Sequence, residues 1–279
     1  MVEEKHKNES NYNNYASCRV SFSYGKYKPT NSIRLGIDNV GHVHRYYHYF
    51  YTKKEVEMIK LIQGDCLKEM FKLEDNSVNM ILSDIPYGEV NRKDSGLRNL
   101  NKGEVDVCEI DLKEMVKQSV RVCDGSFYVF CGIKQISRIT VLFQKYGLFT
   151  RLCVWSKTNP SPINGKHVWL SGLEFCVYCK KPNAVFNEFC KSALWSYPRG
   201  TSTEICTTQK PVPLMERLIL ASTNRNQTVL DFTMGSGTTG EACLNINRNF
   251  IGIELKKDRF NFAKDRIEKH KKLTDSYLI

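Results

Sequence analysis

Short apolar segments alternate with helix-like segments over most of this 279-residue chain, and this alternation constrains the fold more than any other feature. The strand-like segments are residues 59–62, 77–82, 126–131, 151–155, 173–179, 228–232 and 250–253. Residues 112–122 and 211–223 have the apolar spacing of helices, and Pro211 stands where a helix begins. Strands separated by helices predict an α/β domain with a mostly parallel sheet. Ligands bind at the carboxyl ends of such strands, so the polar residues there are the candidates for a site.

Composition narrows the class of protein. The 41 Lys and Arg residues exceed the 30 Asp and Glu residues, which gives a net charge of +11 and favours a polyanionic partner such as nucleic acid. No apolar run is long enough to span a membrane, and the first residues lack the apolar core of a secretory signal. The 11 cysteines are therefore expected to be reduced thiols of a cytoplasmic protein.

The first 57 residues differ from the rest, because they hold eight of the 14 Tyr residues together with many Asn and Ser. The aromatic and basic stretch 42–51 follows neither helical nor strand periodicity. We expect residues 1–57 to form a poorly ordered extension and residues 58–279 to form the catalytic domain. The alternative is that these aromatic side chains stack on nucleic-acid bases beside the neighbouring cations.

A glycine-rich turn follows the strand-like segment 228–232 and opens a helix. Gly235, Gly237 and Gly240 allow positive φ and bring backbone N–H groups close to a ligand at the helix N-terminus. The spacing equals that of a dinucleotide-binding turn, and Glu254 at the end of the next strand suits ribose hydroxyls. A dehydrogenase is disfavoured because only about forty residues follow the turn, whereas a dinucleotide fold needs several further strands there. A phosphate-gripping P-loop is disfavoured because no Gly-Lys-Ser/Thr follows.

A second turn, Asp84-Ile85-Pro86-Tyr87, follows the strand-like segment 77–82. Pro86 keeps Ile85 extended, which fixes the direction of the Ile85 carbonyl. The Asp84 carboxylate and this carbonyl are two acceptors for an exocyclic amine, and Tyr87 offers a ring on which a planar group stacks. An ordinary strand-ending turn has the same composition, so the pairing with the glycine turn makes the signal specific.

These two turns together resemble motifs of the amino-group DNA methyltransferases. Asp-Ile-Pro-Tyr is similar to their Asp-Pro-Pro-Tyr catalytic motif, with Ile85 in place of a proline. DFTMGSGTTG, residues 231–240, resembles their S-adenosylmethionine loop, with Phe232-Thr233 in place of Pro-Phe. Segments 64–65, 155–160 and 208–214 match the same pattern. The catalytic motif precedes the cofactor loop, which is the circularly permuted order of the β class, and the resemblance covers about residues 59–270.

The resemblance implies a Rossmann-like methyltransferase fold with a mostly parallel seven-stranded sheet and helices on both faces. It implies methyl transfer from S-adenosylmethionine to the exocyclic amine of a base that has left the duplex. The catalytic residues would be Asp84, Ile85, Pro86 and Tyr87. The cofactor-binding residues would be Asp65 at the adenine edge, Glu254 at the ribose, and Asp84, Lys210, Asp231, Gly235, Ser236, Gly237 and Thr238. Lys210 is the least constrained of these, because a solvated lysine at a helix start has the same sequence signature.

Asp at position 84 favours adenine N6 as the acceptor, since the cytosine-N4 enzymes of the family more often have Ser-Pro-Pro. Cytosine N4 is the alternative, and methylation of RNA or of a glutamine amide is disfavoured because those relatives place the glycine loop first. We expect DNA recognition in residues 89–107 and 157–207, whose cations suit phosphates. Double-stranded DNA is the expected partner; a homodimer and a separate cognate restriction endonuclease are further partners that the resemblance suggests, and no membrane is involved.

No metal site is expected. Cys176 and Cys179 lie three residues apart on a predicted strand and therefore face opposite sides. No second cysteine pair at zinc-ribbon spacing accompanies them, so zinc is disfavoured.

Overall fold

The computed structural model describes residues 32–37, 43–48, 58–87, 110–162, 166–167, 169–200 and 208–276. The chain divides into two units, residues 1–54 and 55–279. In the first unit, β1 (Ser32–Ile37) and β2 (Val43–His48) pair antiparallel, with Ser32 opposite His48 and Ile37 opposite Val43. The periodicity of residues 42–51 did not reveal β2. We predicted poor order for residues 1–57. Apart from β1 and β2, these residues lie outside the described ones, so this stays a prediction.

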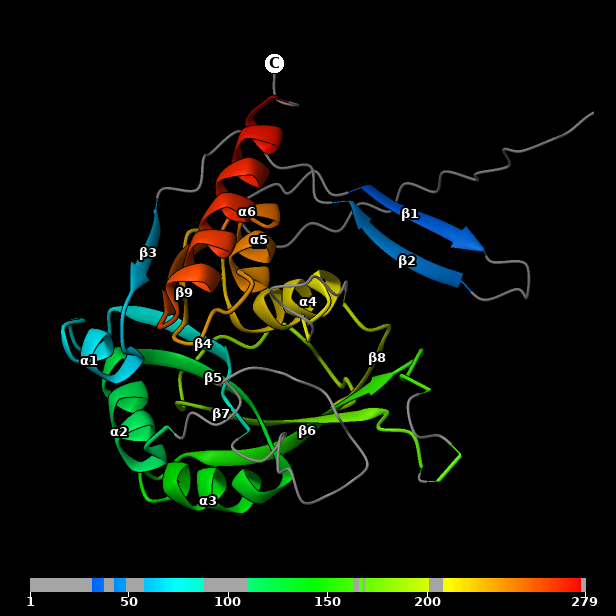
Figure 1. The fold of residues 1–279 in the computed structure, drawn as a ribbon. Coiled ribbons are helices and arrows are strands. Elements are labelled where there is room, and N and C mark those ends of the chain that lie inside the picture. The colour runs from blue at the N-terminus through cyan, green and yellow to red at the C-terminus, as the bar shows by residue number, and fades with distance from the viewer. Residues whose placement is uncertain are drawn as a thin grey trace, which may run out of the picture. The chain divides into compact units, whose positions relative to one another are not determined.

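The second unit is built on one mixed sheet of eight strands in the order β3-β10-β9-β4-β5-β7-β6-β8 (Figure 1). The five strands from β3 to β5 are parallel, β7 runs antiparallel to β5 and to β6, and β8 is parallel to β6. The bounds are β3 Ile59–Gln63, β4 Val78–Asp84, β5 Cys123–Cys131, β6 Phe149–Lys157, β7 Leu173–Lys180, β8 Leu194–Tyr197, β9 Thr228–Asp231 and β10 Asn249–Glu254. All residues of β9 and β10 are buried, as expected of central parallel strands covered on both faces.

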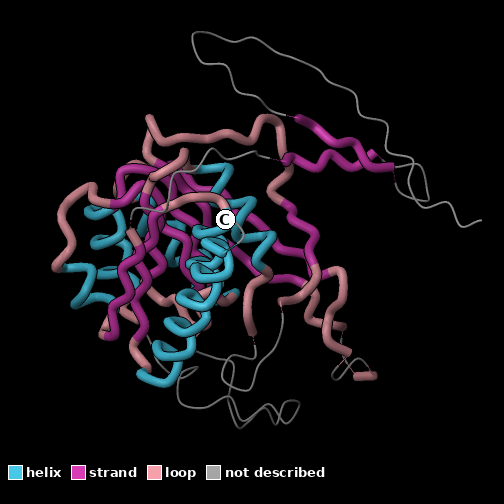
Figure 2. Tube along the Cα trace, turned by 90° about the horizontal axis from the view of Figure 1, so that it is seen from above, coloured by secondary structure: helices cyan, strands magenta, loops and turns pink. Residues whose placement is uncertain are grey.

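Helices cover both faces of this sheet (Figure 2). One face packs against α1 (Cys66–Phe71), α2 (Leu112–Val122) and α3 (Ile133–Gln144), and the other against α4 (Val212–Ser222), α5 (Thr238–Asn245) and α6 (Lys257–Ser276). The sequence starts two of these helices locally, because Asp65 and Asp111 accept backbone N–H bonds as N-caps of α1 and α2. Among the described residues, no helix combines the length and the apolar character needed to cross a membrane.

The predicted Rossmann-like α/β fold is confirmed, and each of the seven predicted strands is present. The sheet nevertheless has eight strands rather than seven, because β8 is added at its edge inside the segment assigned to DNA recognition. β8 has only four residues, and its backbone continues beside β6 with Trp195 opposite Trp155. So short a segment has no periodicity of its own, and its pairing with β6 makes it a strand.

The strand order reverses between β9 and β4, and this reversal determines where a ligand can bind. From β9 the chain continues outward through β10, whereas from β4 it continues through β5 in the opposite direction. In open α/β sheets such a reversal forms the ligand-binding crevice at the carboxyl ends of the parallel strands, so we expect the ligand of this protein to bind there. Asp231 is the last residue of β9 and Asp84 is the last residue of β4.

We predict that Phe127→Ala will destabilise the second unit by about 3–5 kcal/mol, because the Phe127 side chain is fully buried between β5 and α3 and packs on Phe143 at 5.3 Å between ring centroids. Urea unfolding followed by circular dichroism measures the free energy of unfolding. Phe71→Ala is the matched control, because Phe71 is 73% exposed and its loss should change that free energy by less than about 0.5 kcal/mol. Equal effects of the two substitutions would contradict this core assignment.

Candidate active site

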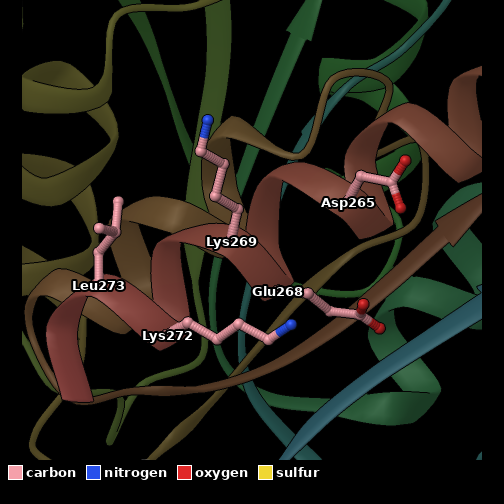
Figure 3. A pocket seen from close by; sticks show the side chains of 5 residues that line it. All are labelled: Asp265, Glu268, Lys269, Lys272 and Leu273. Atoms are coloured by element: carbon pink, nitrogen blue, oxygen red, sulfur yellow. The ribbon is translucent and has the colours of Figure 1, made fainter. Parts of the chain in front are cut away.

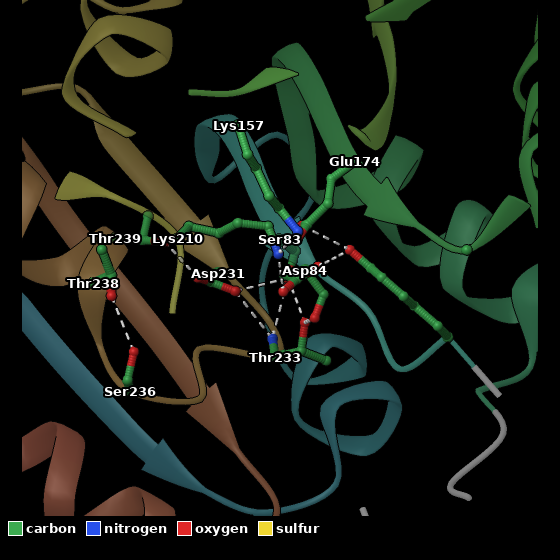
Figure 4. Close-up of polar contacts among 12 residues, drawn as sticks. Ser83, Asp84, Lys157, Glu174, Lys210, Asp231, Thr233, Ser236, Thr238 and Thr239 are labelled. Carbon is green, nitrogen blue, oxygen red and sulfur yellow. Dashed lines mark hydrogen bonds and ion pairs between the residues drawn. The ribbon is translucent and has the colours of Figure 1, made fainter. Parts of the chain in front are cut away.

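Asp231 joins the two turns that the sequence analysis singled out. Its Oδ1 accepts a hydrogen bond from Ser83 Oγ at 2.7 Å, although the two residues are 148 positions apart in the chain. Its Oδ2 accepts a hydrogen bond from Thr239 Oγ1 at 2.6 Å, at the start of α5 (Figure 4). Thr233 adds a bond from its Oγ1 to the Asp84 carbonyl oxygen at 3.0 Å. The Asp84 turn and the glycine loop therefore lie against each other.

The glycine loop has the predicted positive φ at two of its three glycines; Gly240 instead lies inside α5, where an added Cβ would meet Ile267 Cδ1 at 2.5 Å. Gly235 and Gly237 have φ angles of +52° and +77°, in the left-handed region that glycine adopts without strain, and Gly237 caps α5. Glu254 at the end of β10 supports the bend, because its Oε2 accepts a hydrogen bond from the Gly235 backbone nitrogen at 3.0 Å. A Cβ added at Gly235 would meet nothing closer than the Thr233 carbonyl oxygen at 3.9 Å, so open space adjoins this backbone.

The Asp84-Ile85-Pro86-Tyr87 turn is anchored to the neighbouring strand β5. The Ile85 backbone nitrogen donates to the Phe130 carbonyl at 3.1 Å, and the Ile85 side chain is buried in the core. Gln135 Nε2 donates to the Pro86 carbonyl oxygen at 2.9 Å. The Tyr87 hydroxyl donates to Asp84 Oδ1 at 3.0 Å, so the ring lies beside the carboxylate. Asp84 is half-buried, as are Pro86 and Tyr87, and 34% of its side-chain surface is open to solvent.

Glu174 and Lys157, which were not predicted as catalytic or cofactor-binding, extend a chain of ion pairs that begins at Asp84. Lys210 Nζ contacts Asp84 Oδ2 and lies 3.0 Å from Oε2 of Glu174. The other oxygen of Glu174, Oε1, lies 2.7 Å from Lys157 Nζ. Glu174 is the second residue of β7 and Lys157 is the last residue of β6. Because β7 runs antiparallel to its neighbours, its amino end lies at the same edge of the sheet as the carboxyl ends of β4 and β6.

Burial and charge shift the pKa values of these groups. Burial raises the pKa of Asp84, with Lys210 opposing the shift and Glu174 adding to it. Burial alone would raise the pKa of Glu174, but the cations Lys210 and Lys157 outweigh it and hold that pKa at about 2. Burial would lower the pKa of Lys210, and Asp84 and Glu174 instead raise it above its ordinary value. At neutral pH Glu174 is therefore ionised and Lys210 carries its positive charge beside Asp84.

Asp231 is a second carboxyl group with a perturbed pKa. Burial raises the pKa of Asp231 to about 6, and the hydrogen bonds from Thr239 and Ser83 limit that rise. Burial, followed by the neighbouring Asp84 carboxylate, raises the pKa of Tyr87 well above its ordinary value, so its hydroxyl remains a donor. Carboxyl groups with raised pKa values in a crevice at a strand reversal are typical of a functional site.

The remaining predicted residues lie around this centre. Asp65 follows β3, and its Oδ1 accepts backbone N–H bonds from Leu67 and Lys68, both at 3.1 Å. The preceding Gly64 nitrogen donates to the Glu254 carbonyl oxygen at 2.9 Å, which places Asp65 beside Glu254. Ser236 and Thr238 bond to each other through their hydroxyls at 3.0 Å. Lys210 differs from the alternative of a solvated lysine, because 7% of its side chain is exposed and it contacts Asp84.

Several residues of the site carry weak sequence signals. Glu174 is a single acid in the apolar run of β7, which is a signal that could have identified it. Lys157 stands in a segment already matched to the methyltransferase pattern, but its partner was not evident. Ser83 and Thr233 adjoin the two motifs, and only the folded structure shows that they connect them.

The other features that the sequence or the structure offers do not join the site at Asp84. Residues 89–107 lie outside the described residues, and so does part of the second predicted recognition segment, 157–207. No group of His, Cys, Asp or Glu among the described residues is arranged to hold a metal ion. Cys176 and Cys179 belong to the two opposite hydrophobic cores. A hollow of about 430 Å³ runs along α6 (Figure 3), and none of the site residues lines it; its lining is Asp265, Glu268, Lys269, Lys272 and Leu273.

Comparisons with known proteins agree with this geometry. A family model described as DNA methylase matches residues 180–265. The type II methyltransferase M.HpaI of Haemophilus parainfluenzae is 30% identical over 238 residues, which is 75% of this chain and 74% of that protein. The type II methyltransferase M2.MboI of Moraxella bovis is 27% identical over 245 residues, which is 77% of this chain and 90% of that protein. The crystal structure of M1.HpyAVI with SAM matches with a TM-score of 0.58 and 30% identity, covering 75% of this chain and all of that one.

At 30% identity over three quarters of both chains, M.HpaI and this chain belong to one family. The chain belongs to the type II DNA methyltransferases, enzymes that transfer a methyl group from S-adenosylmethionine to an amino group in DNA.

Proposed function

We propose that this enzyme methylates adenine at N6 in double-stranded DNA. The observation that carries the proposal is the Asp84 carboxylate held at the mouth of the crevice, with its backbone carbonyl bonded to Thr233 of the glycine loop at 3.0 Å. This contact brings the amine-binding turn and the cofactor loop together. Asp at position 84, rather than the Ser of the cytosine-N4 pattern, supports adenine as the base.

The residues of the crevice fit S-adenosylmethionine. The uncrowded backbone at Gly235 would adjoin the methionine end, next to Ser236, Gly237 and Thr238. Both Glu254 oxygens accept backbone N–H bonds, from Gly235 and Lys256, and their remaining lone pairs would receive the ribose hydroxyls; Asp65 lies next to Glu254 for the adenine edge. The buried Asp231 holds the end of the loop by accepting a hydrogen bond from Thr239. The cofactor supplies an electrophilic methyl group on a sulfonium, and the anionic groups of the crevice suit that positive charge.

Asp84 and the Ile85 carbonyl would receive the two hydrogens of the target amine. An exocyclic amine is a poor nucleophile because its lone pair is delocalised into the ring, and two such acceptors favour the pyramidal nitrogen that frees this pair. The carboxylate also stabilises the positive charge that develops on nitrogen as the N–C bond forms. Its raised pKa suits Asp84 to take the proton that the methylated nitrogen releases, or to pass it to water.

The target base must leave the duplex to reach Asp84, and Tyr87 offers a ring on which the extruded base stacks. The Tyr87 side chain lies beside the carboxylate, so stacking and amine binding occur at one place. The cations of residues 89–107 and 157–207 are proposed to contact the phosphates of the flanking DNA.

The product of the reaction tests the substrate assignment. We expect that incubation of the purified chain with unmethylated genomic DNA and labelled S-adenosylmethionine will place the label in N6-methyldeoxyadenosine, identified by nucleoside analysis of the digested DNA. Label in N4-methyldeoxycytidine would replace the adenine assignment by cytosine. Label only in RNA or protein supplied in parallel would contradict a DNA substrate.

We predict that Asp84→Ala will lower the rate of methyl transfer by at least about 100-fold, because the variant loses the acceptor for the amine and for the developing charge. The dissociation constant for S-adenosylmethionine, measured by calorimetry, should change far less than the rate. Asp124→Ala is the control, since Asp124 is an exposed residue at the amino end of β5 that bonds to Asn79 at 3.2 Å. Equal turnover by Asp84→Ala and the wild type would exclude this mechanism.

A further inference from the structure

In the proposed function, the target amine and the Lys210 ammonium compete for the Asp84 carboxylate. Both oxygens of the Asp84 carboxylate already accept hydrogen bonds, Oδ1 from the Tyr87 hydroxyl and Oδ2 from the Lys210 ammonium. The target amine needs the same carboxylate. The Lys210 ammonium, a hydrogen-bond donor bearing positive charge, lies against Asp84 (Figure 4). The proposed function places there the amine on which positive charge develops.

Glu174 is placed to resolve this competition. Its Oε2 lies 3.0 Å from Lys210 Nζ and 3.3 Å from the Tyr87 hydroxyl, so one oxygen serves both donors that contact Asp84. Either donor can therefore leave Asp84 and keep a charged acceptor. This matters for Lys210 above all, because only 7% of its side chain is exposed and a buried ammonium without a partner is strongly unfavourable.

Lys157 fixes Glu174 in this role. It binds the other carboxylate oxygen, Oε1, at 2.7 Å, and its side chain is 13% exposed. Its ammonium also lies 5.3 Å from the centroid of the Trp155 ring, which restricts where it can move. Glu174 is thus bound from one side and presents its second oxygen to Lys210 and Tyr87. The two cations and two carboxylates balance, so moving Lys210 toward Glu174 leaves the cluster neutral.

We propose that Glu174 is a positioning residue for methyl transfer: it withdraws Lys210 and Tyr87 from Asp84 when the target amine arrives, and Lys210 holds the place of that amine until then. This inference rests on the proposed function, because it assumes that Asp84 receives the amine. It assigns to Glu174 an action through Lys210 and Tyr87, without contact to the base.

The test is Glu174→Gln in the full chain, measured as the single-turnover rate with saturating S-adenosylmethionine and unmethylated genomic DNA. We expect the rate to fall by about 10-fold or more, because Lys210 and Tyr87 are left with Asp84 as their charged acceptor and compete with the amine. Adding Lys210→Met removes the competitor and leaves one cation and one carboxylate, so the double variant should regain most of the lost rate. Glu174→Asp, which keeps the charge, should lie nearer the wild type than Glu174→Gln.

The pH dependence of the same rate separates this role from a merely structural one. The rate requires ionised Asp84, so it falls as the pH drops through the Asp84 pKa. Glu174 raises that pKa and Lys210 lowers it. Glu174→Gln should therefore move the acid limb of the profile to lower pH, and Lys210→Met should move it to higher pH. Loss of packing alone would not shift the acid limb in opposite directions in the two variants.

Glu69→Gln is the matched control, because Glu69 on α1 has the same 17% side-chain exposure as Glu174 and also pairs with a lysine, Lys72, at 2.7 Å. It should keep the wild-type rate. A wild-type rate in Glu174→Gln, or a double variant no faster than Glu174→Gln, would overturn the inference. If thermal unfolding shows that Glu174→Gln does not fold, Lys210→Met alone decides, and an unmoved acid limb overturns it. A wild-type chain that does not methylate DNA would instead refute the proposed function.

Discussion

The hydrogen bond between Ser83 and Asp231 is the contact on which the site depends. It ties the end of β4 to the end of β9 where the strand order reverses. The turn that is proposed to bind the amine and the glycine loop follow these two strands, so this contact fixes how far apart they lie. Asp231 also binds Thr239 at the start of α5, and a single buried carboxylate thus aligns strand, loop and helix. Such alignment is what methyl transfer requires, because the nitrogen, methyl carbon and sulfur must be held in line.

Charge organises the open side of the same crevice. Lys157, Glu174 and Lys210 form a chain of ion pairs that ends on the partly exposed Asp84. Balanced charges allow four ionisable groups to share a poorly solvated place, whereas any one of them alone would be costly. In the proposed function, this arrangement provides Asp84 as an acceptor once Lys210 has moved to Glu174, and it keeps both cations paired. A reaction that develops positive charge on nitrogen benefits from both properties.

Sequence reasoning recovered the fold and the two central motifs because both leave local marks. Apolar runs that end in Asp84 and Asp231 identify strands whose carboxyl ends carry the site, and Gly235 and Gly237 mark a backbone that needs positive φ. The ionic chain left no such mark. Glu174 reaches the site only because β7 runs against its neighbours, and strand direction depends on pairing between distant segments. For the same reason β8 was not foreseen: its four residues become a strand only beside β6.

The sequence by itself determined the α/β class, the positions of seven strands, the conformation of the glycine loop and the resemblance that implies S-adenosylmethionine and an amine acceptor. These follow from periodicity, turn chemistry and motif order, which can be read along the chain without knowing which segments pair. The tertiary structure alone decided which side chains meet: Ser83 with Asp231, and Lys210 with both Asp84 and Glu174. Ser83 and Asp231 are 148 positions apart in the chain and Asp84 and Lys210 are 126 apart, and only the packing of the sheet brings their charges and hydrogen-bonding groups together.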